Sequence, residues 1–147
     1  MIYLLRHGDA EDGDGDGDDH ARRLTPKGER QADAAGGALA VLGARIDACL
    51  TSSRVRAADT ARLACASLGV EPEDAEELRG GPFDSASLAA GRGSVLLVGH
   101  EPDLSGEIAR LTGGRVKMKK GGLAVVESGT LLALLRPTEL AAIAAER

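Results

Sequence analysis

The chain opens with an apolar run that ends directly at a cation, an imidazole and a glycine. Residues 1–5 read Met-Ile-Tyr-Leu-Leu, and Arg6, His7 and Gly8 follow. A short apolar run of this kind is typical of a buried strand. In open α/β sheets ligands bind at the carboxyl ends of the strands, and glycine allows the turn and the close approach of a ligand. The opening therefore predicts a core strand that delivers Arg6 and His7 to a functional sheet edge, with simple capping of the strand in solvent as the alternative.

A second apolar run, residues 94–98, ends in the same way at Gly99 and His100. Helix and strand patterns alternate over most of the remaining chain, which predicts the α/β class. Helices are expected over residues 25–42, 52–68, 83–90, 104–112 and 138–146, and strands over 46–51, 123–126 and 131–135, with 76–78 as a short strand or loop edge. The last two strands form a predicted hairpin, so the sheet is not expected to be purely parallel.

Composition limits the class of protein. The 147 residues, 43% of them hydrophobic, suit one globular domain over residues 1–147. A net charge of −5 without a basic stripe argues against a nucleic-acid partner. Cys49 and Cys65 have the spacing of neither a disulfide framework nor a metal site. With no leader ahead of the first strand and no apolar run near the ~18 residues that span a membrane, we expect a cytoplasmic protein without membrane contact.

Residues 11–20 form a low-complexity acidic segment. The alternation at Asp12, Asp14 and Asp16 imitates the start of an EF-hand calcium loop, but Arg23 stands where that loop needs a glutamate. We therefore expect a solvated loop, in which His20 is exposed.

Two further arginines stand at the start of the predicted second helix. Arg54 and Arg56 oppose the helix dipole there, which favours a role in holding an anion. The alternative is a pair of surface arginines bound to Asp59 or Glu76.

If the strands are parallel neighbours, these groups meet as a cage of guanidinium and imidazole groups that fits a phosphoryl group. One imidazole would attack phosphorus, and the arginines would lower its pKa and keep it neutral. A metal site built from His7, Asp9 and His100 is a second hypothesis, against which the charge of Arg6 argues. A third is a module that binds phosphate without catalysis.

Three motifs in this order resemble the histidine phosphatase superfamily. They are Leu5-Arg6-His7-Gly8-Asp9-Ala10, the segment Ser52 to Thr60, and Val98-Gly99-His100-Glu101-Pro102. The turns at 24–28 and 119–124 resemble its small SixA-type branch, the protein phosphohistidine phosphatases. Ser53 departs from the usual proline of the second motif.

The resemblance implies a three-layer α/β/α fold of the phosphoglycerate mutase type, with a mostly parallel sheet. It also implies His7 as the phosphorylated nucleophile, Arg6 and Arg56 as phosphate ligands, and His100 as the second histidine. Gly8 is expected to approach the substrate. No cofactor and no metal are implied.

The proton donor is left open. Glu77 is in about the right place, Glu76 and Asp9 are substitutes, and a solvated acidic patch is the alternative. An imidazole leaves more readily than an alkoxide. A weak or absent proton donor in the enzyme therefore reduces the rate less for phosphohistidine than for a phosphoester. The expected substrate is phosphohistidine on a protein, and a small phosphoester is the alternative. The absence of a long lid insertion favours the former.

Overall fold

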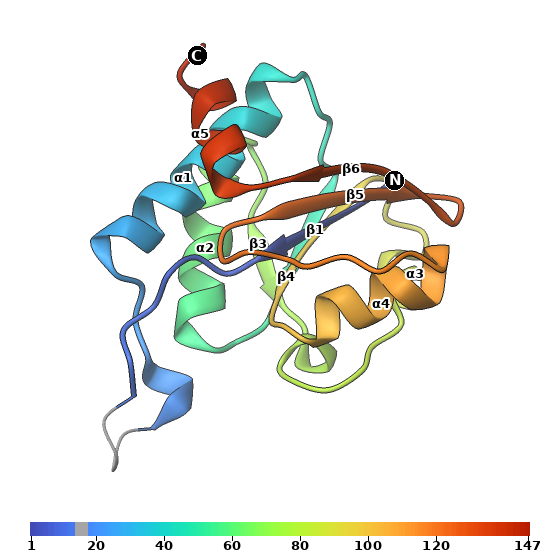
Figure 1. Cartoon of the computed structure of the whole chain (residues 1–147), viewed down its shortest axis with the longest axis horizontal. Helices are drawn as coiled ribbons and strands as arrows, with labels where there is room; N and C mark the ends of the chain where they lie inside the picture. Colours follow the sequence, from blue (N-terminus) through green and yellow to red (C-terminus); the bar gives the residue numbers. More distant parts are fainter. Residues whose placement is uncertain (14–17) are drawn as a thin grey trace.

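The computed structural model describes residues 1–13 and 18–147, and its framework is one mixed sheet between two helical layers (Figure 1). Its strands are β1 (Ile2–Arg6), β2 (Ala48–Thr51), β3 (Pro72–Asp74), β4 (Val95–Gly99), β5 (Leu123–Glu127) and β6 (Thr130–Leu135). Its α-helices are α1 (Pro26–Val41), α2 (Val55–Cys65), α3 (Ser85–Ala89), α4 (Asp103–Thr112) and α5 (Pro137–Ala144). Two 3₁₀ turns, η1 (Asp19–Ala21) and η2 (Glu76–Leu78), complete the described elements. The predicted α/β class and three layers are confirmed.

The strand order is β3-β2-β4-β1-β5-β6, so the two motif-bearing strands β1 and β4 are direct neighbours. β1, β2, β3 and β4 are parallel, whereas β5 and β6 run antiparallel as the predicted hairpin. In the β1–β4 pair, Arg6 lies opposite Gly99. This register brings the residues that follow both strands to the same edge of the sheet.

Side chains alternate between the two faces of the sheet because successive residues of a strand point in opposite directions. Leu5, Leu96 and Val98 pack on one face beneath α1, α2 and α5. Leu4 and Leu97 pack on the other face with Leu104 and Ile108 of α4 (Figure 1). These leucines and Val98 are fully buried.

Helix α1 begins where the sequence predicts it. The Thr25 hydroxyl caps it by accepting the backbone N–H of Gly28, and Pro26 occupies its first turn. Helix α1 packs tightly against a neighbouring helix at Gly36. A Cβ at Gly36 would lie 2.1 Å from the backbone oxygen of Ala64, so the close contact is with α2.

Three local predictions need correction. Residues 76–78 form η2 and not a strand, and the edge strand is β3 just before it. Helix α2 begins at Val55, which leaves Arg54 as its N-cap residue and outside the first turn. The end of the acidic segment, residues 18–20, forms η1 and its N-cap together with Ala21, and His20 is half-buried there and not exposed as expected. Residues 14–17, within the segment expected to be a solvated loop, lie outside the described residues.

Cys49 and Cys65 are both free, and both are buried in the core beneath α1 and α2. Within residues 1–13 and 18–147, no helix has the length and hydropathy to cross a bilayer.

Candidate active site

The site is built where β1 and β4 end side by side. The backbone N–H of His7 donates to the carbonyl oxygen of Gly99 at 3.1 Å, which extends the strand pairing by one step. The rings of His7 and His100 lie 5.2 Å apart between centroids, tilted by 56°. Both histidines are buried, with 6% and 8% of their surface exposed. The structure thus brings together the two imidazoles that the sequence places ninety-three positions apart.

One hydrogen bond fixes the tautomer of His7. Its Nδ1 lies 2.7 Å from the carbonyl oxygen of Gly8, and a carbonyl can only accept, so Nδ1 carries the proton. The Nε2 atom therefore keeps its lone pair. Burial lowers the pKa of His7 to about 4, and the charges of Arg56, Arg6 and Lys120 add to this. The direction of this shift agrees with the prediction from the neighbouring arginines, but burial, and not the arginines, is its largest cause.

His100 is oriented from the second motif. Its Nε2 lies 2.8 Å from Ser52 Oγ. The same oxygen accepts the backbone N–H of Arg54, so the Ser52 hydroxyl can donate to Nε2, which places the His100 proton on Nδ1. Burial and the nearby His7 lower the pKa of His100 to about 3. Ser52 falls within the helix expected over 52–68, but it lies ahead of α2 in the structure and contacts a histidine 48 residues away.

The two predicted phosphate ligands have buried guanidinium nitrogens that contact no acceptor. Arg6 donates from Nη1 to the carbonyl oxygen of Met118, while Arg56 donates from Nη1 to the carbonyl oxygen of Asp19. Arg6 Nε, Arg56 Nε and His100 Nδ1 are buried and find no hydrogen-bond partner among the described residues. A buried donor without an acceptor costs about 1–3 kcal/mol. The charges of Arg6 and Arg56 act on His7, and His100 is its ring neighbour, so three such nitrogens on these residues favour an anionic ligand.

Comparison with known proteins agrees with this geometry. The family model of the histidine phosphatase superfamily (branch 1) matches residues 2–86, more than half of the chain. The chain belongs to this superfamily.

Individual relatives match most of the chain. An uncharacterized protein of Picosynechococcus sp. is 36% identical over 141 residues, covering 87% of this chain and 85% of the relative. The crystal structure of an Agrobacterium tumefaciens protein assigned as phosphohistidine phosphatase SixA has a TM-score of 0.82 at 25% identity, covering 92% and 97% of the two chains. The protein histidine phosphatase SixA complexed with tungstate has the same fold, with a TM-score of 0.80 at 24% identity over 95% and 98% of the chains.

Asp19 is the acidic partner of Arg54 and Arg56 at the start of α2. Its Oδ2 lies 2.6 Å from Arg54 Nη1 and 3.2 Å from Arg56 Nη2. The alternative prediction, that these arginines pair with Asp59 or Glu76, is wrong. These two carboxylates pair with arginines of their own elements, because residues three apart on a helical turn are neighbours. No sequence pattern singles out Asp19 within its acidic run.

Gly8 connects the motif at residues 5–10 to helix α2 by a hydrogen bond. Its N–H donates to Thr60 Oγ1 at 3.0 Å, and the Thr60 hydroxyl donates in turn to the carbonyl oxygen of Arg56. A Cβ on Gly8 would lie 2.5 Å from the carbonyl oxygen of Gly28. Close packing of two backbones is therefore the visible reason for glycine here, and the expected approach of Gly8 to substrate stays a prediction.

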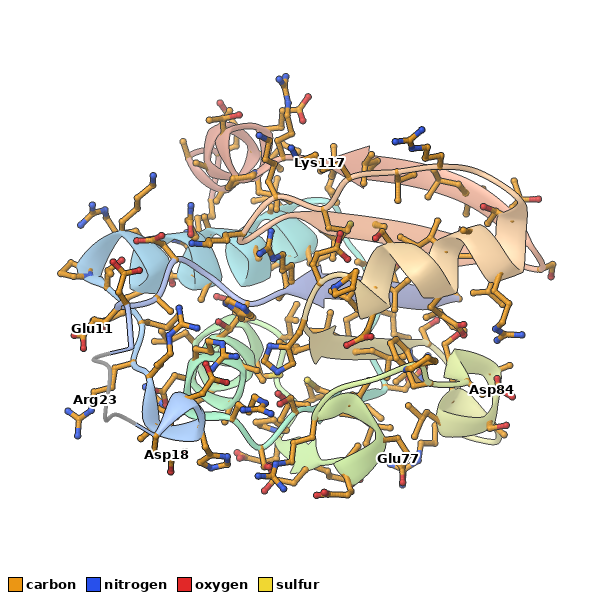
Figure 2. All side chains as sticks on the ribbon, turned by 60° about the horizontal axis from the view of Figure 1, so that its bottom comes forward. Glu11, Asp18, Arg23, Glu77, Asp84 and Lys117 are labelled. Carbon is orange, nitrogen blue, oxygen red and sulfur yellow. The ribbon has the colours of Figure 1, made fainter. Side chains whose placement is uncertain are left out.

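The carboxylates around the site are held by other groups or lie at the surface. Asp9 accepts the Thr25 hydroxyl and pairs with Lys120, and both interactions lower its pKa. Glu101 accepts the backbone N–H of Ser105 in the first turn of α4. Glu77 is exposed on η2, and Figure 2 shows it at the outer edge of the molecule. No described contact joins Glu77 to either histidine, so its role as proton donor stays a prediction.

The metal-site hypothesis finds no matching donor set in the part of the chain that the structure describes. Within it, no cluster of three or more His, Cys, Asp or Glu side chains could hold a metal ion. Asp9 is engaged by Thr25 and Lys120, so it does not join His7 and His100 in a ligand group.

Proposed function

We propose that this histidine phosphatase hydrolyses phosphohistidine on proteins through a phosphorylated His7, without a metal. The observation that carries the proposal is the set of three buried, unpartnered nitrogens beside a histidine whose Nε2 lone pair is free. The phosphoryl oxygens would accept from Arg6 Nε, Arg56 Nε and His100 Nδ1. Such preorganised donors stabilise the charge that spreads over the oxygens during phosphoryl transfer.

The reaction would take two displacement steps. In the first, His7 Nε2 forms a bond to phosphorus while the bond between phosphorus and the substrate ring breaks. The substrate ring, protonated on its other nitrogen, takes the electron pair of that bond and leaves as a neutral imidazole. In the second, water attacks phosphorus and the bond to His7 breaks. The proton of the attacking water passes to a phosphate oxygen or to solvent, and inorganic phosphate and the neutral imidazole of His7, with its proton still on Nδ1, are released. A pKa of about 4 keeps His7 unprotonated, and therefore nucleophilic, at neutral pH.

The carboxylates favour a substrate with a good leaving group. The pKa values of Asp9 and Asp19 are both lowered, mainly by hydrogen bonds from Thr25 and Arg22, so neither carboxyl carries a proton at neutral pH. An alkoxide needs protonation as it leaves, whereas an imidazole leaves without a strong acid. Phosphohistidine is therefore the better fit, and a small phosphomonoester is the alternative substrate.

The decisive experiment traps the intermediate. Wild-type protein incubated with a ³²P-labelled phosphohistidine protein and quenched in alkali, in which phosphohistidine survives, is expected to carry label on His7. His7→Ala should lose the label and the phosphate release, while His20→Ala, which removes the one histidine outside the site, should keep both. A chelator should change neither.

Three results would count against the proposal. Label that persists in His7→Ala would exclude His7 as the nucleophile. Phosphate binding by the wild type without label or turnover would favour the phosphate-sensing module. Rapid turnover of phosphoserine or a sugar phosphate, without turnover of phosphohistidine, would favour the small-phosphoester alternative.

A further inference from the structure

A row of cations borders the site on the side opposite the acidic segment. Residues 113–120, between α4 and β5, run without regular secondary structure. Arg115, Lys117 and Lys119 are exposed along it, and Val116 and Met118 between them face inward. None of these three cations forms an ion pair with any residue that the structure describes. In a chain with a net charge of −5, a row of unpaired cations is a distinct surface.

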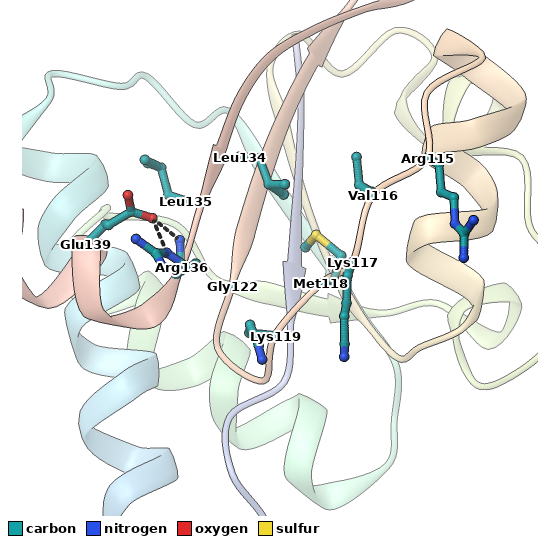
Figure 3. Close-up of a pocket in the computed structure, with 10 residues that line it drawn as sticks. All are labelled: Arg115, Val116, Lys117, Met118, Lys119, Gly122, Leu134, Leu135, Arg136 and Glu139. Atoms are coloured by element: carbon teal, nitrogen blue, oxygen red, sulfur yellow. Dashed lines mark hydrogen bonds and ion pairs between the residues drawn. The ribbon is translucent and has the colours of Figure 1, made fainter.

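The basic row lines a groove. The cavity of about 390 Å³ lies between residues 115–119 and the junction of β6 with α5 (Figure 3). Leu134 and Leu135 contribute apolar surface to it. Its one acidic residue, Glu139, is bound to Arg136 by both the backbone N–H and the Nε of that arginine. The groove therefore presents uncompensated positive charge over an apolar lining.

The segment that carries the row is hydrogen-bonded to Arg6 and His7. Met118 accepts a hydrogen bond from Arg6 through its carbonyl oxygen. The N–H of Gly121 lies 3.1 Å from the carbonyl oxygen of Arg6 and 3.0 Å from that of His7. Four extended residues span about 13 Å, so Lys117 lies within roughly that distance of the segment that holds the nucleophile.

Charge is distributed unequally around the site. Figure 2 shows Lys117 on one side of the molecule and Asp18 and Glu77 on the opposite side. In Figure 3 the side chains of Arg115, Lys117 and Lys119 point in the same direction. A protein that carries its phosphoryl group beside an acidic segment would match this polarity, whereas a small phosphoester would be too short to reach the row.

We propose that Arg115, Lys117 and Lys119 dock an acidic segment of the phosphorylated protein, while the phosphoryl group of that protein enters the site at His7. This inference rests on the proposed function and extends it to the choice of partner. Complementary charge mainly raises the rate of encounter and selects among partners. The basic row of Arg115, Lys117 and Lys119 should therefore affect kcat/KM for a protein substrate and leave the chemistry at phosphorus unchanged.

The test compares three substrates on one enzyme. The first is free phosphohistidine. The second is a phosphohistidine peptide with glutamates about three to five residues from the phosphohistidine, a separation that matches the span of about 13 Å between Lys117 and the segment of His7. The third is the same peptide with glutamines in place of the glutamates. At low ionic strength we expect kcat/KM for the glutamate peptide to be about tenfold above that for the glutamine peptide. Added salt should reduce this preference, because it screens exposed charges.

The variant Lys117→Gln/Lys119→Gln should reduce the preference to less than about twofold, without changing kcat/KM for free phosphohistidine. The matched control is Arg45→Gln/Arg92→Gln. These exposed arginines precede β2 and β4, at the opposite end of the parallel strands, and their loss changes the net charge equally. The control should keep the full preference.

The outcomes separate docking from catalysis. Equal kcat/KM for both peptides, with free phosphohistidine hydrolysed, would overturn the docking surface and leave the proposed function standing. If none of the three phosphohistidine substrates is hydrolysed, the proposed function fails, and binding of the fluorescently labelled, unphosphorylated peptides decides the docking surface. The docking surface is supported if the glutamate peptide binds more tightly than the glutamine peptide and if Lys117→Gln/Lys119→Gln abolishes this difference. Equal binding of the two peptides to the wild type would overturn the docking surface.

Discussion

At the scale of single residues, one hydrogen bond decides which nitrogen of His7 can react. The bond from Nδ1 to the Gly8 carbonyl leaves Nε2 as the only atom with a free lone pair. The neighbouring His100 receives the same kind of support from Ser52 Oγ. Each imidazole is thus oriented by one polar contact at its far side, which leaves the near side for a ligand.

Asp19 performs a similar positioning task for Arg56. Its carbonyl oxygen accepts from Nη1 and its Oδ2 from Nη2, so the Nε of Arg56 stays free and buried. Asp19→Ala should lower kcat about tenfold, since a small displacement of a phosphate ligand is costly in phosphoryl transfer. Asp19→Asn keeps an oxygen acceptor and should stay within about threefold of the wild type.

Steady-state kinetics with a phosphohistidine peptide measures the kcat of both variants and of the wild type. Equal losses in Asp19→Asn and Asp19→Ala would show that the negative charge matters and the hydrogen-bond geometry does not. An unchanged kcat in Asp19→Ala would remove the positioning role altogether.

At the scale of elements, the loop after β1 and the first turn of α1 touch backbone to backbone. A Cβ on Gly28 would lie 2.0 Å from the carbonyl oxygen of Asp9, and neither backbone can move without disturbing the Thr25 cap or the end of β1. Gly28→Ala should therefore lower the free energy of unfolding by about 1–3 kcal/mol.

Urea unfolding tests this expectation, with Gly106→Ala as the control. Gly106 lies inside α4 and has no heavy atom within 4 Å of an added Cβ, so alanine there should raise stability by about 0.5–1 kcal/mol. Destabilisation by both substitutions would mean that steric contact at Gly28 is not the cause.

At the scale of the whole molecule, folding buries two neutral imidazoles beside fixed cations. An unfolded histidine titrates near pH 6.5, whereas the pKa values of His7 and His100 are about 4 and about 3 in the folded protein. Between these values the unfolded chain binds more protons, so stability falls as the pH decreases from about 6.5. Below about pH 3 this contribution stops changing.

Between pH 7 and pH 5 each of the two histidines should remove about 2 kcal/mol from the free energy of unfolding. Urea denaturation of the wild type and of His7→Gln/His100→Gln at both pH values measures the difference, since glutamine does not titrate. Parallel losses in the two proteins would show that these histidines titrate normally in the fold.

Local patterns along the chain were sufficient for much of this protein. Apolar runs, caps and glycines predicted the alternation of strands and helices, the closing hairpin, and the strand ends that carry Arg6, His7 and His100. These features depend on residues close together in the chain, where propensity and periodicity act directly. The weakly patterned region from 71 to 94 was misread at β3 and η2, because a short edge strand there depends on pairing with β2.

Only the tertiary structure decided which groups meet at the site and which atoms remain free. The pairing of Asp19 with Arg54 and Arg56, the contact of Ser52 with His100, and the tie between Met118 and Arg6 all join distant segments. Sequence periodicity carries no information about such contacts, because they arise from the order of the strands and the packing of the loops that follow them. The chain by itself thus determined the residue types that suit a phosphoryl group, and the fold decided their geometry, their protonation and their neighbours.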